Sequence, residues 1–452
     1  MHILKGYTKQ EISWMMYDWA NSAHSVIIVT LLPIFFDTVA GYTADSVSSM
    51  STWGYATSIA MLIVALAAPF LGVFGDIRGM RKKLFSFFML LGVAACAGMA
   101  FTPGMDFTSG PVAAGKVASL ILVLYIVSVI GFDASAIYYD AFLTDVTIED
   151  RMDKVSTMGY GLGYIGGSTI PLLIFLIMNL VGVPMLTCLA FVFGLTAVWW
   201  LAFSLPLLKN CEQTSGKPYE KGDVARSIKG VGTTIKEIIA NKPMLIYILS
   251  YFFYIDGVHT VISMATTYGT NLGLDSTGMM LALLLVQILG LPFCLLYIKC
   301  SEKFGARTMV GFGICVYMFI CIFAFFMNSL WQFWVLAVLC ATSQGGIQAL
   351  SRSMYGKLIP DKDRSGEFFG FFDIFGKFSS IMGPALVGVV SSMVANGMLG
   401  AQGLTAQTAT AEQIDAINAQ SSHYGILSII IIIIVGAVLY FGFLPKAEHA
   451  KQ

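Results

Sequence analysis

Charged side chains are scarce in this sequence of 452 residues, since Asp, Glu, Lys and Arg together make up only 12% of it. An average soluble domain carries about 25% charged residues. Hydrophobic residues reach 57%, and a soluble globule of this size could not hide so much apolar surface from water. The 26 basic residues are balanced by 26 acidic ones, so the chain also lacks the excess of positive charge that nucleic-acid binding requires. These shortages exclude a water-soluble enzyme, a disordered chain and a nucleic-acid-binding protein, and they indicate a protein of the lipid bilayer.

Motifs of nucleotide and metal chemistry are missing as well. The eight cysteines contain no C-x-x-C spacing and lie mostly in apolar runs, as is typical of small buried hydrophobic residues. The P-loop pattern, H-E-x-x-H and G-x-S-x-G do not occur. One G-x-G-x-x-G string, at 161–166, lies inside an apolar run and lacks the acidic residue expected downstream, so we interpret its glycines as helix-packing positions. We therefore expect neither an enzyme nor a bound cofactor or metal.

Long apolar runs recur along the whole chain. A membrane-spanning helix needs about 20 mostly apolar residues, and twelve segments meet this requirement. The first is too long for a cleavable signal peptide and contains Asp18, which we expect to cap or snorkel at the inner interface. The sequence thus predicts an all-α membrane protein with twelve transmembrane helices. They cover about 13–37, 52–75, 84–103, 117–142, 154–181, 185–208, 243–271, 276–299, 307–328, 331–357, 366–396 and 422–443.

Basic residues alternate between the two sides of the predicted membrane. Lys and Arg gather before the first span and in every second loop, whereas Lys116 alone lies in the other loops. The side rich in Lys and Arg is normally cytoplasmic, so we expect both termini in the cytoplasm. The longest basic loop falls in the middle of the chain. It predicts an N-terminal six-helix bundle at 1–208, a cytoplasmic linker at 209–242 and a C-terminal six-helix bundle at 243–452.

The two predicted halves resemble each other at three equivalent points. The first span contains Asn-Ser-Ala-His-Ser-Val-Ile and the seventh contains Asp-Gly-Val-His-Thr-Val-Ile, and two charged loops also match. The paired segments are 21–27 with 256–262, 75–81 with 301–307, and 150–151 with 363–364. Internal repeats of this kind are frequent in secondary transporters, whose site lies between the repeats. The pattern therefore favours two parallel halves that rock against each other.

Four strings carry a family resemblance. Residues 72–82 (GVFGDIRGMRK) resemble the loop motif of the major facilitator superfamily, with Ile77 in place of the motif's first Arg. YDWANSA at 17–23, QGGIQALSRS at 344–353 and EFFGFFDIFGKF at 367–378 resemble the vacuole effluxer-like branch of that superfamily. The resemblance implies the major facilitator fold with two pseudo-symmetric bundles and a cavity lined by spans one, four, seven and ten. It also implies amino-acid export, because eukaryotic members of the branch are linked to vacuolar amino-acid efflux.

Polar side chains inside the predicted spans are candidates for a solute or ion pathway, because a charge at bilayer depth is costly unless it is paired or faces water. In the first span, Asn21 and His24 are candidates for facing a cavity. Asp256 lies about 20 Å from the inner end of the seventh span, near the midplane. We interpret it as a candidate proton carrier with His259 as its partner, the alternative being a structural hydrogen bond. Asp133 in the fourth span lies at similar depth and competes for the same role.

Spans ten and eleven add further polar groups. Gln344 and Gln348 lie one turn apart, and Arg352 follows one turn later, near the inner mouth. A guanidinium there could bind a substrate carboxylate through two hydrogen bonds or pair with an acidic side chain. Lys377 is the one basic residue well inside a predicted span. It could form an ion pair with Asp373, four residues earlier, or act as the positive anchor of the cavity.

Charged residues at the predicted inner loops form a second group. Asp76 lies in the loop motif, and Asp140 lies at the inner end of the fourth span. We expect ion pairs between these loops to latch one conformational state, since contacts that differ between two states bias their equilibrium. The predicted latch residues are Asp76, Arg78, Arg81, Asp140, Arg352 and Glu367.

These observations predict a secondary active transporter that moves a small polar solute by proton-coupled alternating access, in export or exchange. An amino acid or similar zwitterion fits best, because the candidates supply both a cationic and an anionic anchor. A proton or sodium gradient would provide the driving force. The alternatives are a passive facilitator, a transporter of a sugar, organic acid or peptide, and a transporter-like sensor without flux. We expect a monomer in the cell membrane whose partners are a small-molecule substrate and the lipid bilayer.

Overall fold

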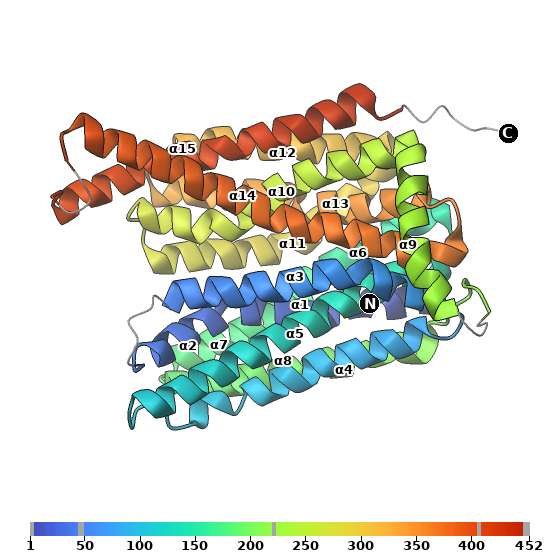
Figure 1. Ribbon diagram of the computed structural model, residues 1–452, viewed down its shortest axis with the longest axis horizontal. Coiled ribbons are helices and arrows are strands. Elements are labelled where there is room, and N and C mark those ends of the chain that lie inside the picture. Colours follow the sequence, from blue (N-terminus) through green and yellow to red (C-terminus); the bar gives the residue numbers. More distant parts are fainter. Residues whose placement is uncertain (1–3, 44–48, 219–222, 405–407, 446–452) are drawn as a thin grey trace. The chain divides into compact units, whose positions relative to one another are not determined.

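The computed structural model describes residues 4–43, 49–218, 223–404 and 408–445, and this part of the chain is almost entirely helical (Figure 1). Within it, twelve helical segments are long and apolar enough to cross a membrane. This number confirms the predicted fold class. The termini that we expect in the cytoplasm include residues 1–3 and 446–452, which lie outside the described residues.

The helices belong to two compact units. Unit 1 comprises Met1–Thr233 together with Ile359–Ile374, and unit 2 comprises Thr234–Leu358 together with Phe375–Gln452. The sequence gives no indication that 359–374 belongs with the N-terminal helices. The boundaries at 208 and 243, and the linker between them, stay predictions.

Unit 1 is built from eight α-helices and three short helical turns. The α-helices are α1 (Lys9–Thr30), α2 (Leu32–Ala40), α3 (Ser49–Gly75), α4 (Arg81–Met99), α5 (Pro111–Val146), α6 (Met152–Gly163), α7 (Ile170–Leu180) and α8 (Met185–Asn210). The turns are η2 (Thr102–Gly104), η3 (Glu149–Arg151) and the π-helical η4 (Tyr164–Thr169). Helix α1 packs on α5, α6 and α8, and α4 packs on α5 and α8.

Unit 2 contains the helices of the C-terminal half. They are α10 (Lys242–Asn271), α11 (Ser276–Phe304), α12 (Ala306–Phe325), α13 (Leu330–Leu358), α15 (Ala411–Val438) and the π-helical η6 (Leu439–Phe443). Here α10 packs on α15, and α13 packs on α11 and α12. Helix α9 (Asp223–Ala240) precedes α10. The turn η5 (Lys362–Arg364) and the first ten residues of α14 (Ser365–Ala401) belong to unit 1, and the rest of α14 belongs to unit 2.

Several helices are interrupted where proline removes a backbone donor. Pro33 lies in the first turn of α2 and separates it from α1 within a single predicted span. Pro171 lies in the first turn of α7, directly after the π-helical turn η4. Because proline cannot donate to the carbonyl four residues earlier, the preceding turn widens. Pro384, by contrast, lies inside α14 without ending the helix.

Small residues let the helices of unit 1 approach closely. A Cβ atom at Gly131 of α5 would lie 2.5 Å from the backbone nitrogen of Gly92 in α4. A Cβ atom at Gly166 would lie 2.0 Å from the Trp19 ring, and one at Gly163 would lie 2.5 Å from a side-chain oxygen of α1. These contacts confirm the packing interpretation for the second and third glycines of the G-x-G-x-x-G string.

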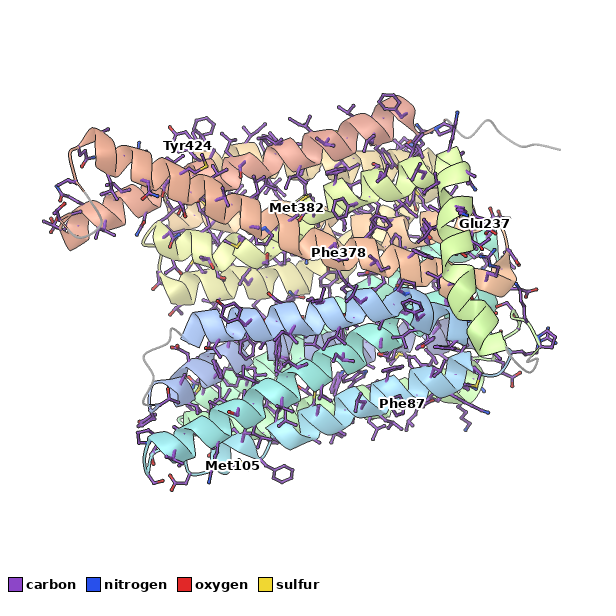
Figure 2. All side chains as sticks on the ribbon, in the orientation of Figure 1. Phe87, Met105, Glu237, Phe378, Met382 and Tyr424 are labelled. Carbon is purple, nitrogen blue, oxygen red and sulfur yellow. The ribbon has the colours of Figure 1, made fainter. Side chains whose placement is uncertain are left out.

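Large apolar side chains remain on the outside of the helices. Phe87 of α4 projects away from its helix bundle (Figure 2) and is 59% exposed. Exposed hydrophobic side chains also occur on α3, α8 and α12. Such a surface is unfavourable in water and is suited to contact with lipid chains.

Candidate functional site

Arg81, the first residue of α4, lies at the centre of a buried polar cluster in unit 1. Its fully buried side chain forms ion pairs with Asp76 at 2.9 Å and with Asp145 at 2.5 Å. The guanidinium also donates to the hydroxyl of Ser365 at 2.8 Å. We call Asp76, Arg81, Asp145 and Ser365 the Arg81 cluster. A buried guanidinium without a counter-charge is strongly unfavourable, and the two carboxylates of the cluster supply that counter-charge.

Asp76 also binds the first turn of α14. Its Oδ1 accepts a hydrogen bond from the backbone N–H of Gly366 at 2.7 Å, and its Oδ2 accepts one from Glu367 at 2.8 Å. N–H groups in a first helical turn have no partner inside the helix and attract negative charge. A Cβ atom at Gly366 would lie 2.5 Å from the carbonyl oxygen of Gly72, so this contact requires glycine. Burial raises the pKa of Asp76 to about 7, although Arg81 and the two N–H donors favour its charged form.

The segment that follows α8 packs over the same loop. The Gln213 side chain accepts hydrogen bonds from the backbone N–H groups of Gly79 at 2.9 Å and Arg81 at 3.2 Å. Its amide also donates to the carbonyl oxygen of Gly75 at 3.0 Å. One glutamine therefore fixes both ends of the loop between α3 and α4.

Asp145 connects this segment to the Arg81 cluster. Its Oδ1 accepts hydrogen bonds from the hydroxyl of Thr214 at 2.9 Å and from the hydroxyl of Ser215 at 2.7 Å. The next residue, Gly216, donates its backbone N–H to Asp363 at 2.8 Å. The start of the predicted linker is thus bound both to α5 and to the turn that precedes α14.

The predicted latch residues divide into two groups. The structure brings Asp76 and Arg81 together and places the backbone of Glu367 beside them. The Glu367 side chain itself forms an ion pair with Arg364 at 3.0 Å. The other three predicted latch residues are not members of the Arg81 cluster: Arg78 is exposed, Asp140 is half-buried in α5, and Arg352 is buried in α13. Whether any of them latches a state stays a prediction.

The polar groups of α1 lie among aromatic side chains in unit 1. Asn21 is buried and forms a side-chain hydrogen bond with Tyr17. The ring of His24 stacks on Phe132 of α5 with centroids 4.8 Å apart and lies 5.1 Å from the ring of Trp200. Neither ring nitrogen of His24 has a hydrogen-bond partner among the described residues. His24 therefore lies in apolar surroundings with two uncommitted nitrogens.

Asp133 and Asp18 are further buried carboxyl groups of unit 1. Asp133 of α5 is 2% exposed. Asp18 of α1 accepts a hydrogen bond from the hydroxyl of Tyr139 at 2.7 Å, and a Cβ atom at Gly159 would lie 2.3 Å from the same carboxyl oxygen. The expectation that Asp18 caps or snorkels at the interface is wrong, because a tyrosine of α5 supplies its donor inside the bundle.

Asp256 of α10 is the most deeply buried carboxyl group of unit 2, with an exposed fraction of 0%. Its Oδ1 accepts hydrogen bonds from the backbone N–H of Gly383 at 2.9 Å and from the Thr260 hydroxyl at 3.4 Å. Its Oδ2 has no hydrogen-bond partner among the described residues. Gly383, next to Pro384 in α14, thus supplies a backbone donor to Asp256, and the role of His259 as its partner stays a prediction.

The remaining candidates of unit 2 come from three helices. His259 of α10 forms a side-chain hydrogen bond with Gln348 of α13 and has an electrostatic interaction with the ammonium group of Lys377 in α14. The Gln348 amide donates to the carbonyl oxygen of Gln344 at 3.1 Å. Gln344 also lines a small cavity of about 90 Å³, together with Gln287 of α11. The structure thus brings His259, Gln348 and Lys377 together.

Each unit thus contains a set of buried polar side chains among otherwise apolar helices. Polar and ionisable side chains in such places mark solute and ion pathways. Among the described residues, no group of three or more His, Cys, Asp or Glu side chains could hold a metal ion. The chemistry that these residues can perform is hydrogen bonding, charge pairing and proton transfer.

Comparison with known proteins shows to which family this chain is related. The family model described as "Vacuole effluxer Atg22 like" matches residues 41–149 and 144–400. The chain is 40% identical to the MFS-type transporter YxiO of Bacillus subtilis (strain 168) over 452 residues, which cover 98% of this chain and 96% of that protein. The chain belongs to the vacuole effluxer Atg22-like family. It is an MFS-type transporter and a multi-pass membrane protein.

More distant relatives agree with this assignment. Autophagy-related protein 22-1 of Penicillium rubens is 25% identical to this family member over 274 residues, which cover 55% of this chain and 46% of the fungal protein. The proton:xylose symporter XylE superposes with a TM-score of 0.70 at 15% identity, over 97% of this chain and 96% of that chain. The human organic anion transporter MFSD10 superposes with a TM-score of 0.61 at 13% identity, over 96% and 99%. At these identities the solved structures show the major facilitator fold alone.

Sequence reasoning about this Atg22-like transporter missed several residues that the fold brings into contact. Gln213 lies in a polar loop where no pattern distinguishes it, and Ser365 is one small residue among many. Gly383 carries a readable signal, because a Gly-Pro pair inside a long apolar run indicates a kink with exposed backbone groups. That signal could have suggested a polar partner for α14, but not that the partner is Asp256.

Proposed function

We propose that this transporter exports or exchanges an amino acid or similar zwitterion by proton-coupled alternating access. The observation that carries the proposal is Asp256, a fully buried carboxyl group with one oxygen bonded to Gly383 and Thr260 and the other without a described partner. An ionised carboxylate is unfavourable in such surroundings. Loss of a proton from Asp256 would therefore change its contact with α14, which couples proton movement to helix movement.

The charged and amide groups near Asp256 in sequence and fold support a zwitterionic substrate. Lys377 is a cationic group at the His259–Gln348 pair and can bind a substrate carboxylate, with Arg352 as the alternative anchor. Asp133 and Asp256 stay the two candidates for binding the ammonium group. Asn21 and His24 stay candidates for facing a cavity in unit 1.

Related proteins support this direction and coupling. The family is named for vacuole effluxers, which supports export. XylE is a proton:xylose symporter, which supports a proton as the driving ion, with sodium as the alternative. We place the protein in the cell membrane as a monomer with both termini in the cytoplasm, because Lys and Arg gather in the loops on that side.

The coupling role is tested by Asp256→Asn in proteoliposomes. We expect accumulation driven by a pH gradient to be abolished while exchange of labelled for unlabelled substrate continues, because Asp256 then carries the proton and Asp133 binds the ammonium group. Loss of both activities would assign Asp256 to substrate binding instead. Asp133→Asn tests the competing carboxyl group. Asp106→Asn, which alters an exposed loop carboxylate, serves as the control and should behave like the wild type. Unchanged accumulation in the Asp256 variant would remove this residue from coupling.

The substrate class is tested by thermal stability of the purified protein with amino acids, small peptides, sugars and organic acids. A ligand at a hundred times its Kd stabilises the protein by about 2.7 kcal/mol. Stabilisation by another class alone would replace the amino-acid assignment while leaving the transporter. A passive facilitator is distinguished by flux, since it would show no stimulation by substrate on the opposite side.

A further inference from the structure

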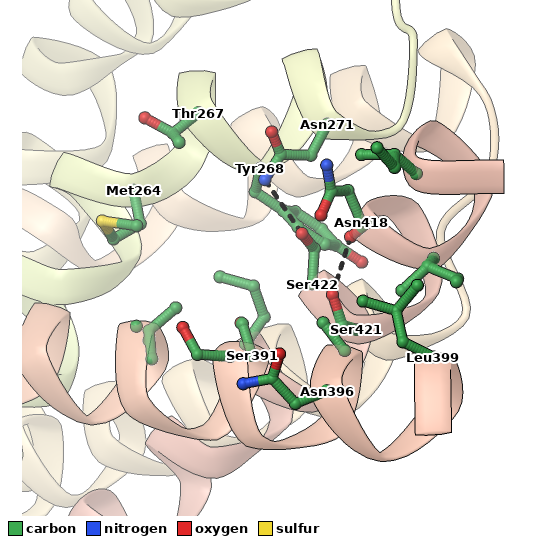
Figure 3. Close-up of a pocket in the computed structure, with 17 residues that line it drawn as sticks. Met264, Thr267, Tyr268, Asn271, Ser391, Asn396, Leu399, Asn418, Ser421 and Ser422 are labelled. Carbon is green, nitrogen blue, oxygen red and sulfur yellow. Dashed lines mark hydrogen bonds between the residues drawn. The ribbon is translucent and has the colours of Figure 1, made fainter. Parts of the chain in front are cut away.

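Unit 2 contains a second cavity that none of the residues discussed above lines. It has a volume of about 420 Å³ and lies between α10, α14 and α15, next to the loop that joins α14 to α15 (Figure 3). Cavities of about 300–1,000 Å³ are typical of sites for small molecules. We call it the α10–α14–α15 pocket.

The lining of this pocket changes along its length. Met264, Val387 and Ile426 lie at the end farthest from the α14–α15 loop, and Asn271, Asn396 and Asn418 lie nearer to it. The positions of Val387 and Asn396 on α14 are separated by about 14 Å along the helix axis. Side chains of serine and threonine line the part between. These are Thr267, Ser391, Ser392, Ser421 and Ser422. Three apolar side chains, Leu399, Ile414 and Ile417, line the pocket next to the asparagines on the loop side. The pocket therefore has an apolar end and, on the loop side, a polar end in which amide groups lie among apolar side chains.

Free hydrogen-bonding groups are concentrated at the polar end. The Asn271 amide donates to the Ser422 hydroxyl at 2.9 Å, whereas the side-chain amides of Asn396 and Asn418 bond to none of the described residues, and both are exposed. In Figure 3 the labelled side chains of Asn396 and Asn418 lie on opposite walls, one from α14 and one from α15. Each amide can donate two hydrogen bonds and accept two. Such groups are suited to the adjacent hydroxyls of a polyhydroxylated head.

The one aromatic residue of the lining is held by contacts outside the pocket. The Tyr268 hydroxyl donates to the carbonyl oxygen of Ala324 at 2.5 Å and contacts Nδ1 of His423 at 2.7 Å. The hydroxyl is therefore committed, and the ring is the part of Tyr268 available to a ligand. Rigid aromatic faces of this kind stack on the apolar faces of sugar rings and alkyl chains.

Charge is the property that the pocket lacks. All the described residues that line it are uncharged. An ion or a zwitterion would lose its hydration there without a counter-charge, which is unfavourable. The pocket thus differs from the group around Asp256, His259 and Lys377, and it is poorly suited to the substrate proposed above.

We propose that the α10–α14–α15 pocket binds an amphipathic ligand with an uncharged, hydroxyl-rich head and an apolar tail, as in a monoglycosylated lipid. The head contacts Asn396 and Asn418, and the tail extends toward Met264 and Val387. A free sugar shares the chemistry of the head, so the experiment separates the two sources. The site is independent of the transported substrate.

The test measures protection of a single reactive cysteine in the full chain, reconstituted in phosphatidylcholine nanodiscs free of sugar detergents. Ser392→Cys, at an exposed lining position, is labelled with a maleimide in a Cys300→Ser/Cys315→Ser/Cys340→Ser background, because these three native cysteines are not buried. Octyl glucoside below its micellar concentration is the lipid-like probe, and glucose is the free-sugar probe. At ten times its Kd, a ligand that covers the site slows labelling about tenfold. Gly397→Cys, an exposed position on the same helix outside the lining with open space around it, is the matched control.

Saturable protection of the Ser392→Cys protein by octyl glucoside but not glucose would support the glycolipid-type ligand. Protection by both would support the head chemistry and assign the site to a free sugar. The double variant Asn396→Leu/Asn418→Leu should lose the protection, and because both side chains are exposed its thermal stability should match the parent. The proposal is overturned if neither probe protects, if the Gly397→Cys control slows equally, or if octyl phosphocholine, with its charged head, protects as well as octyl glucoside.

Discussion

The contact between Asp76 and the start of α14 gives the sharpest prediction. Asp76→Asn keeps one acceptor oxygen. It loses the negative charge that pairs with Arg81 and the hydrogen bond from one of the two backbone N–H groups of α14. A hydrogen bond to a charged group contributes about 1.5–3 kcal/mol. Arg81 retains Asp145, so we expect a net loss of about 2 kcal/mol. Since about 1.4 kcal/mol corresponds to a factor of ten, detachment of residues 365–374 should become about 30-fold more frequent.

Cysteine labelling at Ser365 measures this change directly. Ser365 is fully buried, contacts Arg81 at 2.8 Å, and differs from cysteine by one atom. We expect Ser365→Cys, in a Cys300→Ser/Cys315→Ser/Cys340→Ser background that removes the native cysteines that are not buried, to react with a water-soluble maleimide about 30-fold faster when Asp76→Asn is present, if opening precedes labelling. Asp106→Asn is the matched control and should leave the rate unchanged. Equal labelling rates with Asp76 and with Asn at position 76 would refute both the capping argument and the predicted latch.

Two further predictions rest on other contacts. Gly383→Ala places a Cβ atom 1.8 Å from the Thr260 hydroxyl oxygen, so the melting temperature should fall by the equivalent of about 1–3 kcal/mol; adding Thr260→Ala should recover part of the loss, and no recovery would mean that another contact is responsible. Glu11→Gln weakens a partly exposed ion pair with Arg151 at 2.7 Å and should cost about 0.5–1.5 kcal/mol, measured by thermal unfolding. A variant as stable as the wild type would show that this pair contributes little.

The glycines and prolines show which features the local sequence can predict and which it cannot. Gly163 and Gly166 are recognisable as packing positions because small residues inside an apolar run have few other uses. The Gly-Pro pair at 383–384 is interpreted as a packing position on the same grounds. Neither signal identifies the neighbour, and the neighbours turn out to be Trp19 in one case and Asp256 in the other.

The candidate site is predicted less completely than the fold. Asp256 and His259 are recognisable as buried polar residues because ionisable groups are rare in apolar spans. Their partners are Gly383 and Gln348, which come from other helices. Side-chain pairing across helices depends on rotation and depth of each helix, and these are set by packing.

The sequence by itself determines the twelve spans, the membrane class and the family, because bilayer thickness imposes a length and an apolar composition that each segment carries locally. Only the tertiary structure decides that residues 359–374 join unit 1 and that Asp76 binds a backbone group 291 positions away. No local pattern encodes such a contact. It forms because Gly72 and Gly366 allow two backbones to approach and because a buried Arg81 needs its carboxylates.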